Sequence, residues 1–163
     1  MALQSKLKTW TYLIVVLIFI EAILIWVLIN LFFNSPEISY LISIPVIIFF
    51  VFILTWLVYG ELRTKAIKIE ISEYEIIKSG YLGLGPKKKF MLSDFDGYQI
   101  AILSTEYTSY EYLYLMINKK KVIKISEFYH VNYDEIKKLL LKKISKSGEQ
   151  QFSLIREIKE IFT

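Results

Sequence analysis

The chain contains no cysteine, one histidine and three prolines in 163 residues. Without cysteine it can form no disulfide, and it offers neither a thiolate nucleophile nor a cysteine ligand for a metal. It also lacks a glycine-rich phosphate loop and a Ser/His/Asp arrangement of the kind that hydrolases use. These absences argue against an enzyme. We therefore expect no catalytic residues, no cofactor and no metal site.

Charged residues are nearly absent from two long apolar stretches, residues 13–33 and 40–59, and the one exception is Glu21. A helix of about 20 residues is about 30 Å long, which matches the hydrocarbon core of a bilayer. Trp10 and Trp56 lie near ends of these stretches, where bilayer interfaces favour aromatic side chains. The sequence therefore predicts two transmembrane helices that form an antiparallel hairpin.

The distribution of positive charge predicts the orientation of this hairpin. Lysine and arginine lie before the first stretch and after the second, at Lys6, Lys8, Arg63, Lys65 and Lys68, whereas residues 34–39 carry only Glu37. Because positive residues favour the cytoplasmic side, we expect a multi-pass protein of the inner membrane with both termini in the cytoplasm. We expect the first stretch to be retained, because it is too long for a signal peptide and no small-residue cleavage motif follows it.

Beyond residue 60, apolar residues alternate with polar ones, as in half-buried strands. Six strands are predicted, at residues 67–71, 74–78, 87–92, 98–103, 110–117 and 122–126. The last two form a hairpin around a short polar turn. In its first strand, alternation places Leu113 and Leu115 on one face and Tyr112 and Tyr114 on the other.

Two amphipathic helices are predicted after the strands. Asn132 and Glu135 have the spacing of a capping box, which predicts a helix that begins there. Its apolar residues share one face, and we expect it to end at Ser147 and Gly148. A second helix is predicted at residues 152–162, where apolar residues again fall on one face.

The order of these elements resembles bacterial membrane proteins that carry a pleckstrin-homology-like (PH-like) domain after two transmembrane helices. The resemblance rests on IKIEISEYEIIKSG from Ile67, KKKFMLSDFDGYQI from Lys87 and YLYLMINKKKVIKISEFYHVNYDEIKKLLLKKI from Tyr112. It implies an α+β fold in which a bent antiparallel sheet, or split barrel, is capped by a C-terminal helix. The chain would then comprise a transmembrane hairpin at residues 1–60, a PH-like cytoplasmic domain at 61–147 and an amphipathic helix at 148–163.

The sequence departs from this family pattern in two ways. Seven strands are usual, and only six are predicted. We expect the seventh in one of two irregular stretches, residues 81–86 or 104–109. The helix at residues 152–162 is an addition, and its apolar face has no assigned partner.

Two runs of lysine next to turns are the main candidates for a binding site: Lys87, Lys88 and Lys89, and Lys119, Lys120 and Lys121. A lysine near an anionic leaflet contributes about 1 kcal/mol to membrane binding. Many pleckstrin-homology domains bind phosphoinositides through basic loops, so the resemblance implies lipid-headgroup binding here. The alternative is that these lysines are solvated and only keep the domain soluble.

Glu21 is the most unusual single residue, because a carboxylate inside a transmembrane helix costs a few kcal/mol and usually faces protein or water. It indicates either a structural contact, such as one between subunits, or an ion path. With two helices per chain, an ion path would require an oligomer.

Three other features have a structural and a functional interpretation. Asp94 and Asp96 would suit a metal or an acid–base pair, but turn and cap residues are the simpler interpretation. His130 is expected to be a loop residue. The tyrosines Tyr110, Tyr112 and Tyr114 share one strand face, which favours packing over a recognition surface.

We therefore expect a membrane-anchored, non-enzymatic interaction module. A domain held at the cytoplasmic leaflet would bind anionic lipid headgroups, a protein partner or both, and we expect no nucleic-acid partner. The alternative is a small homo-oligomeric transporter or channel subunit that uses Glu21.

Overall fold

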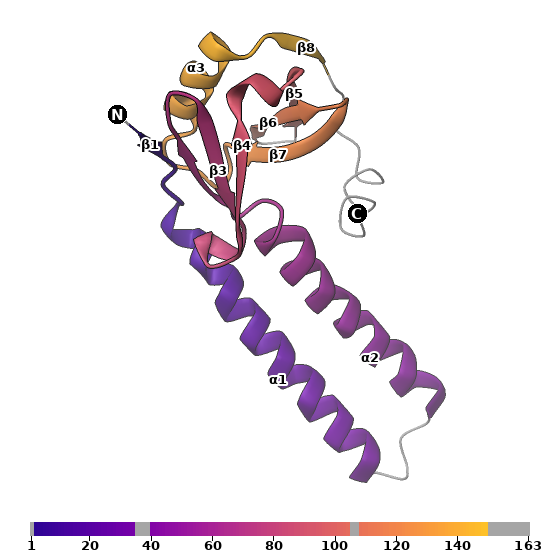
Figure 1. Ribbon diagram of the computed structural model, residues 1–163. Helices are drawn as coiled ribbons and strands as arrows, with labels where there is room; N and C mark the ends of the chain where they lie inside the picture. The colour runs from indigo at the N-terminus through magenta and orange to yellow at the C-terminus, as the bar shows by residue number, and fades with distance from the viewer. Residues whose placement is uncertain (1, 35–39, 105–107, 150–163) are drawn as a thin grey trace.

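The computed structural model describes residues 2–34, 40–104 and 108–149. Two long apolar helices extend from one side of an α+β domain that contains two four-stranded sheets and a helix (Figure 1). The predicted helix at residues 152–162 lies outside the described residues, as does most of the connection at 34–39.

The two helices run antiparallel and side by side (Figure 1). The first is α1 (Leu13–Asn34), which follows a 3-10 turn, η1 (Thr9–Tyr12). The second is α2 (Tyr40–Thr55), which continues as a π-helical segment, η2 (Trp56–Leu62). Both are long and apolar enough to cross a membrane, over 26 and 21 residues respectively.

All six predicted strands are present. They are β2 (Lys68–Ile71), β3 (Glu75–Ser79), β4 (Lys87–Met91), β5 (Gly97–Ser104), β6 (Ser109–Ile117) and β7 (Lys120–Ser126). Two more strands join them, β1 (Leu3–Gln4) and β8 (Lys146–Glu149). Sheet 1 has the order β1-β2-β3-β4, and sheet 2 has the order β7-β6-β5-β8. The described strands thus form two separate sheets, not a closed barrel.

The two added strands correct the sequence prediction. Residues 81–86 form no strand, because Tyr81–Gly83 is a 3-10 turn with positive φ at Tyr81 and Leu82. Residues 104–109 fall partly outside the described residues. The helix predicted to end near Ser147 instead ends at Lys143, and β8 pairs in parallel with β5.

The core lies between the sheets and the helix α3 (Tyr133–Lys143). Alternate residues of β2, Ile69 and Ile71, point into it, as do Leu113 and Leu115 of β6. On α3, the buried side chains are spaced three and four residues apart, at Tyr133, Ile136 and Leu140. Burial of this shared apolar surface holds the sheets and the helix together.

The start of α3 differs from the predicted capping box. Asn132 is the residue before the helix, but its side chain makes no capping hydrogen bond. Its Oδ1 accepts a hydrogen bond from the Lys6 backbone N–H at 2.8 Å, and its Nδ2 donates to the Gln4 carbonyl at 2.9 Å. The Asn132 side chain therefore holds the N-terminal segment, which leaves it unable to cap the helix.

Candidate functional site

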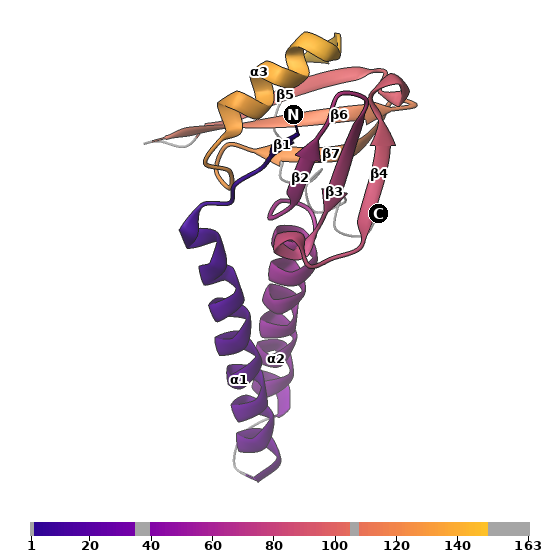
Figure 2. The same cartoon turned by 60° about the vertical axis from the view of Figure 1, so that its left-hand side comes forward.

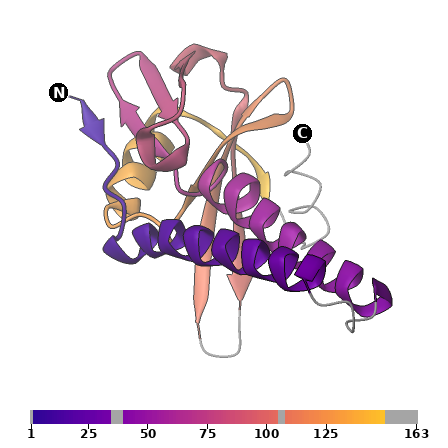
Figure 3. The same ribbon diagram turned by 90° about the horizontal axis from the view of Figure 1, so that it is seen from below.

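The region where the two apolar helices join the domain contains several polar contacts that sequence patterns did not predict. Sheet 2 crosses above the ends of α1 and α2 (Figure 2). Viewed from below, the hairpin of β5 and β6 passes behind α1 (Figure 3). Strands from the middle of the sequence thus lie against the domain end of both helices.

The segment before α1 is paired with the domain on two sides. β1 is antiparallel to β2, and Ser5 exchanges hydrogen bonds with Ile69, through its backbone N–H at 2.7 Å and its Oγ at 2.8 Å. On the other side, the Lys8 backbone N–H donates a hydrogen bond to the Tyr129 carbonyl at 2.9 Å, and Leu7 forms an isolated antiparallel β-bridge with His130. The domain is therefore attached to both apolar helices, to α2 by the chain that leaves it and to α1 by this segment.

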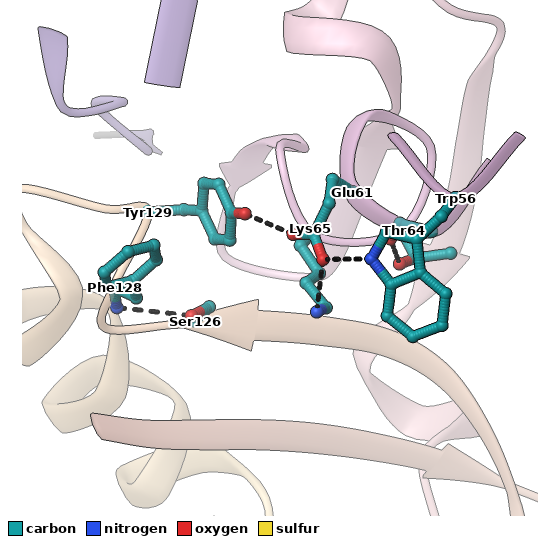
Figure 4. A network of polar contacts seen from close by, with 8 residues as sticks. Trp56, Glu61, Thr64, Lys65, Ser126, Phe128 and Tyr129 are labelled. Atoms are coloured by element: carbon teal, nitrogen blue, oxygen red, sulfur yellow. Dashed lines mark hydrogen bonds and ion pairs between the residues drawn. The ribbon is translucent and has the colours of Figure 1, made fainter. Parts of the chain in front are cut away.

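A network that we call the juxtamembrane network joins η2 to the domain, and consists of Trp56, Glu61, Lys65 and Tyr129 (Figure 4). The Lys65 ammonium lies 2.7 Å from Glu61 Oε1, which also accepts a hydrogen bond from the Trp56 indole at 3.2 Å. The Tyr129 hydroxyl donates to Glu61 Oε2. The Lys65 and Glu61 side chains are only 9% and 14% exposed, so this ion pair is largely desolvated.

Sequence reasoning missed this network. The spacing of Glu61 and Lys65, four residues apart, is a recognisable ion-pair signal on a helix, but nothing in the sequence indicated its partner Tyr129. Aromatic contacts add to it, because the Trp10 ring lies 4.2 Å from the Phe128 ring and 5.1 Å from the Tyr129 ring, between centroids. The predicted interfacial tryptophan therefore also packs against the domain.

His130 lies in a turn, as predicted, but it is almost completely buried, with 1% of its surface exposed. Its Nδ1 lies 2.9 Å from the Ser126 carbonyl and its Nε2 lies 3.0 Å from the Ile67 carbonyl. Burial lowers the pKa of His130, and the charge of Lys8 acts in the same direction, whereas the two backbone contacts oppose it. The ring therefore connects the end of β7 to the start of β2 as a structural residue.

Three cations lie near one another where sheet 1 borders the end of η2, and we call Arg63, Lys78 and Lys88 the basic cluster. Lys78 and Lys88 are directly opposite each other on β3 and β4. Burial, together with the positive charges of Lys88 and Arg63, lowers the pKa of Lys78 to about 8. The Lys78 ammonium donates to the Val122 carbonyl at 2.9 Å, which links the two sheets.

The first predicted lysine run begins beside this cluster. Lys87, Lys88 and Lys89 are all exposed on β4. Lys89 lies 2.5 Å from the Glu75 carboxylate, whereas Lys87 pairs with Ser79 at the end of β3 that leads to Gly80. Gly80 packs so closely on the Arg63 backbone that a Cβ there would lie 3.0 Å from the Arg63 carbonyl oxygen. The start of β4 therefore lies close to Arg63, the residue that follows η2.

The second predicted run lies at the opposite end of β7 from Tyr129, about 20 Å away along the strand. Lys119 and Lys120 are exposed, and the Lys119 backbone donates to Asp96 at 2.8 Å. Lys121 is partly buried, because an irregularity in register between Leu115 and Met116 turns it to the same sheet face as Lys124. The two lysine runs therefore lie apart in the fold. Within the second run, Lys119 and Lys120 are exposed and Lys121 is not.

Glu21 lies partly buried on α1. Its Oε1 atom is shielded from solvent and accepts no hydrogen bond from any part of the chain that the structure describes. A shielded carboxylate oxygen without a partner is costly in an apolar environment. Among the polar residues of α1 and α2, Glu21 is therefore the one that most clearly needs a hydrogen-bond partner.

The two aspartates act as turn residues. Asp94 accepts a hydrogen bond from the Met91 backbone at 3.2 Å, and Asp96 accepts the one from Lys119. Within residues 2–34, 40–104 and 108–149, no group of three His, Cys, Asp or Glu side chains has the arrangement of a metal site. Both aspartate side chains thus accept hydrogen bonds from the backbone, as turn and cap residues do.

The tyrosine strand packs as predicted. Tyr112 and Tyr114 are buried on the face of β6 opposite to Leu113 and Leu115, and Tyr110 contacts Phe128 with a ring-centroid distance of 4.7 Å. This face therefore continues into the aromatic contacts at the end of α1.

No protein family, no curated protein and no solved structure matches this chain. The chain is thus characterised by its own geometry: two helices long and apolar enough to cross a membrane, and a two-sheet domain that carries the juxtamembrane network and the basic cluster where it joins these helices.

Proposed function

We propose that this protein is a membrane-anchored, non-enzymatic module that holds a PH-like domain against the cytoplasmic leaflet of the inner membrane, where the domain binds anionic lipid headgroups. Six strands in two antiparallel arrays, with α3 packed on their common core, support the PH-like assignment. The positive residues that flank the two helices support cytoplasmic termini.

The observation that carries the lipid proposal is the basic cluster beside the exit of the second membrane helix. Burial and the charges of Lys88 and Arg63 disfavour the charged form of Lys78. A phosphate of a lipid headgroup would supply a negative charge that favours it. Because Arg63 directly follows η2, an anionic leaflet is the nearest source of such a phosphate.

The proposal is tested by the thermal stability of the full chain in nanodiscs. Residues 3–8 pair with the domain, so a fragment that begins at residue 61 would lack a strand of sheet 1. We expect the unfolding temperature to be higher when a third of the phosphatidylcholine is replaced by phosphatidylglycerol, because a ligand that binds the folded state stabilises it.

Matched charge reversals distinguish a site from a general effect of charge. Lys88→Glu should abolish most of the lipid-dependent rise in unfolding temperature, whereas Lys120→Glu, an equal change of charge at the far end of β7, should preserve it. An equal loss in both variants, or no rise in the wild type, would contradict the proposed site.

A second candidate function rests on Glu21. Its shielded Oε1 atom has no partner among the described residues, and a helix of another subunit could supply one. If the protein is a small oligomeric transporter or channel subunit, Glu21→Leu should change the mass of the detergent-solubilised particle. A wild-type particle that is a strict monomer would exclude this function.

A further inference from the structure

Residues 80–86 connect β3 to β4 at the end of sheet 1 that borders η2, and we call them the leucine loop. The Leu82 backbone N–H donates to the carbonyl of Ala66, four residues after η2, at 2.8 Å. The Leu82 side chain packs on the apolar cluster that contains Ile14 of α1 and Leu62 of η2. The loop reaches the level of the domain ends of both helices (Figures 1 and 2). It therefore belongs to the junction between the domain and the apolar helices.

Leu84, in the middle of this loop, is turned outward. It is 89% exposed, which exceeds the 66% of Phe19 on the apolar helix α1. Two hydrogen bonds hold the loop in this form. The Leu84 backbone N–H donates to the Tyr81 carbonyl at 3.0 Å, and the Ser79 hydroxyl donates to the Gly85 carbonyl at 2.7 Å. An ordered loop thus presents an apolar side chain whose transfer out of water is favourable.

Exposed lysines lie at the base of the loop. Lys68 of β2 and Lys87 of β4 both pair with Ser79 of β3, so the three residues form a row across the end of sheet 1. Both lysines are exposed. The Lys68 side chain lies against Gly83, where a Cβ would come within 2.7 Å of it. An apolar tip with cations at its base matches a bilayer surface, in which headgroup phosphates lie above hydrocarbon.

We propose that the leucine loop is a third membrane contact of the domain, and that Leu84 inserts into the leaflet where α1 begins and η2 ends. This inference rests on the membrane anchoring in the proposed function, but not on headgroup binding at the basic cluster. The bilayer is the occupant that the position of the loop favours, because the loop packs on the residues where both apolar helices meet the domain. Together with η2 and residues 3–8, a third contact would fix the tilt of the domain on the membrane.

Single thiols test this placement, because the chain has no cysteine. The full chain, in nanodiscs of phosphatidylcholine alone, carries Leu84→Cys or the matched control Tyr74→Cys. Tyr74 is 69% exposed and lies at the other end of β3. In water, an anionic maleimide would react at least as fast with Leu84→Cys, which is more exposed and close to two lysines. We expect the reverse, labelling about tenfold or more slower than at Tyr74→Cys, because a charged reagent does not enter the bilayer.

A third thiol, Phe19→Cys on α1, separates this inference from the anchoring on which it rests. Fast labelling of Leu84→Cys with slow labelling of Phe19→Cys would overturn insertion of the loop alone. Fast labelling of both would overturn the anchoring and the insertion together. Because these nanodiscs contain no anionic lipid, slow labelling of Leu84→Cys would support insertion even if phosphatidylglycerol gave no rise in unfolding temperature.

The native leucine provides a second measurement, because Leu84→Cys makes the loop less apolar. In the wild-type chain with ¹³C-labelled leucine methyl groups, a lipid that carries a nitroxide near its headgroup should broaden the Leu84 signals, which are assigned by their loss in Leu84→Ile. The signals of Leu141 should stay sharp, since α3 lies on the far side of the domain from both apolar helices (Figure 1). No broadening at Leu84, or equal broadening at both leucines, would contradict insertion.

Discussion

His130 is the only histidine in the chain, and burial determines its charge. Because its pKa in the folded protein lies below the ordinary value of 6.5, the folded state resists the proton that the unfolded chain accepts. The stability that this neutral ring contributes is complete above about pH 6.5 and is lost as the pH falls through the folded-state pKa.

We therefore expect the unfolding temperature to fall on acidification from about pH 7 to about pH 5. His130→Gln keeps a hydrogen-bond donor but does not titrate, so its unfolding temperature should fall less over the same interval. Since carboxylates affect both proteins equally, the difference between them reports on His130. Identical pH profiles would show that the ring does not resist protonation.

Glu61 accepts hydrogen bonds or ion-pair contacts from three side chains, those of Trp56, Lys65 and Tyr129. Glu61→Gln keeps the shape of the side chain but removes the carboxylate that lies 2.7 Å from the buried Lys65 ammonium. Removal of one partner of a buried ion pair costs about 3 kcal/mol or more. We expect a loss of that order in the free energy of unfolding, measured by denaturant titration in detergent.

A double variant separates charge burial from packing. Glu61→Gln combined with Lys65→Gln removes both charges of the pair, so part of the lost stability should return. If the double variant is as unstable as the sum of the single variants, the two side chains contribute independently and the ion pair is not the stabilising contact.

At the scale of elements, the N-terminal segment depends on Asn132. Asn132→Ala removes two hydrogen bonds to residues 4–6 and should cost about 2 kcal/mol. Amide hydrogen exchange identifies which element is released. Faster exchange at residues 3–8 is expected, whereas faster exchange confined to the first turn of α3 would show that Asn132 acts as a helix cap.

The elements with strong periodicity were predictable from sequence, and the short ones were not. Apolar alternation specified β2 through β7, and the long apolar runs specified the two helices that are long enough to cross a membrane. β1 has only two residues, and β8 is Lys-Ser-Gly-Glu, with no apolar side chain to show a period. Both form because the free edges of β2 and β5 accept them. The sequences of β1 and β8 do not show this, because it depends on which strands lie at a sheet edge in the folded domain.

The candidate site shows the same limit. The lysine runs were visible as sequence, but Lys78 stands alone in β3, and its proximity to Lys88 and Arg63 follows from the pairing of β3 with β4. The partner of Glu61 lies 68 residues away, at Tyr129. Local spacing reports on contacts within one helix or strand and does not report on contacts between elements distant in sequence.

At the scale of the whole molecule, the domain is joined to the hairpin by more than a linker. Residues 3–8, which precede α1, pair with the domain, and η2 leads from α2 into it. The juxtamembrane network is a further contact between η2 and the domain. Two connections of this kind restrict the domain to a narrow range of orientations relative to the helices. The basic cluster is consequently held beside the end of η2, which is where the proposed function requires it.

The pKa of the Lys78 side-chain amine tests this account most directly. It can be measured by NMR of lysine-labelled full chain, assigned with Lys78→Arg, in nanodiscs with and without phosphatidylglycerol. We predict a pKa near 8 in phosphatidylcholine alone, and a rise in anionic nanodiscs that exceeds the rise at Lys120, because a bound phosphate favours the charged amine. A Lys78 pKa that is the same in both lipids, or that rises no more than that of Lys120, would contradict headgroup binding at the basic cluster.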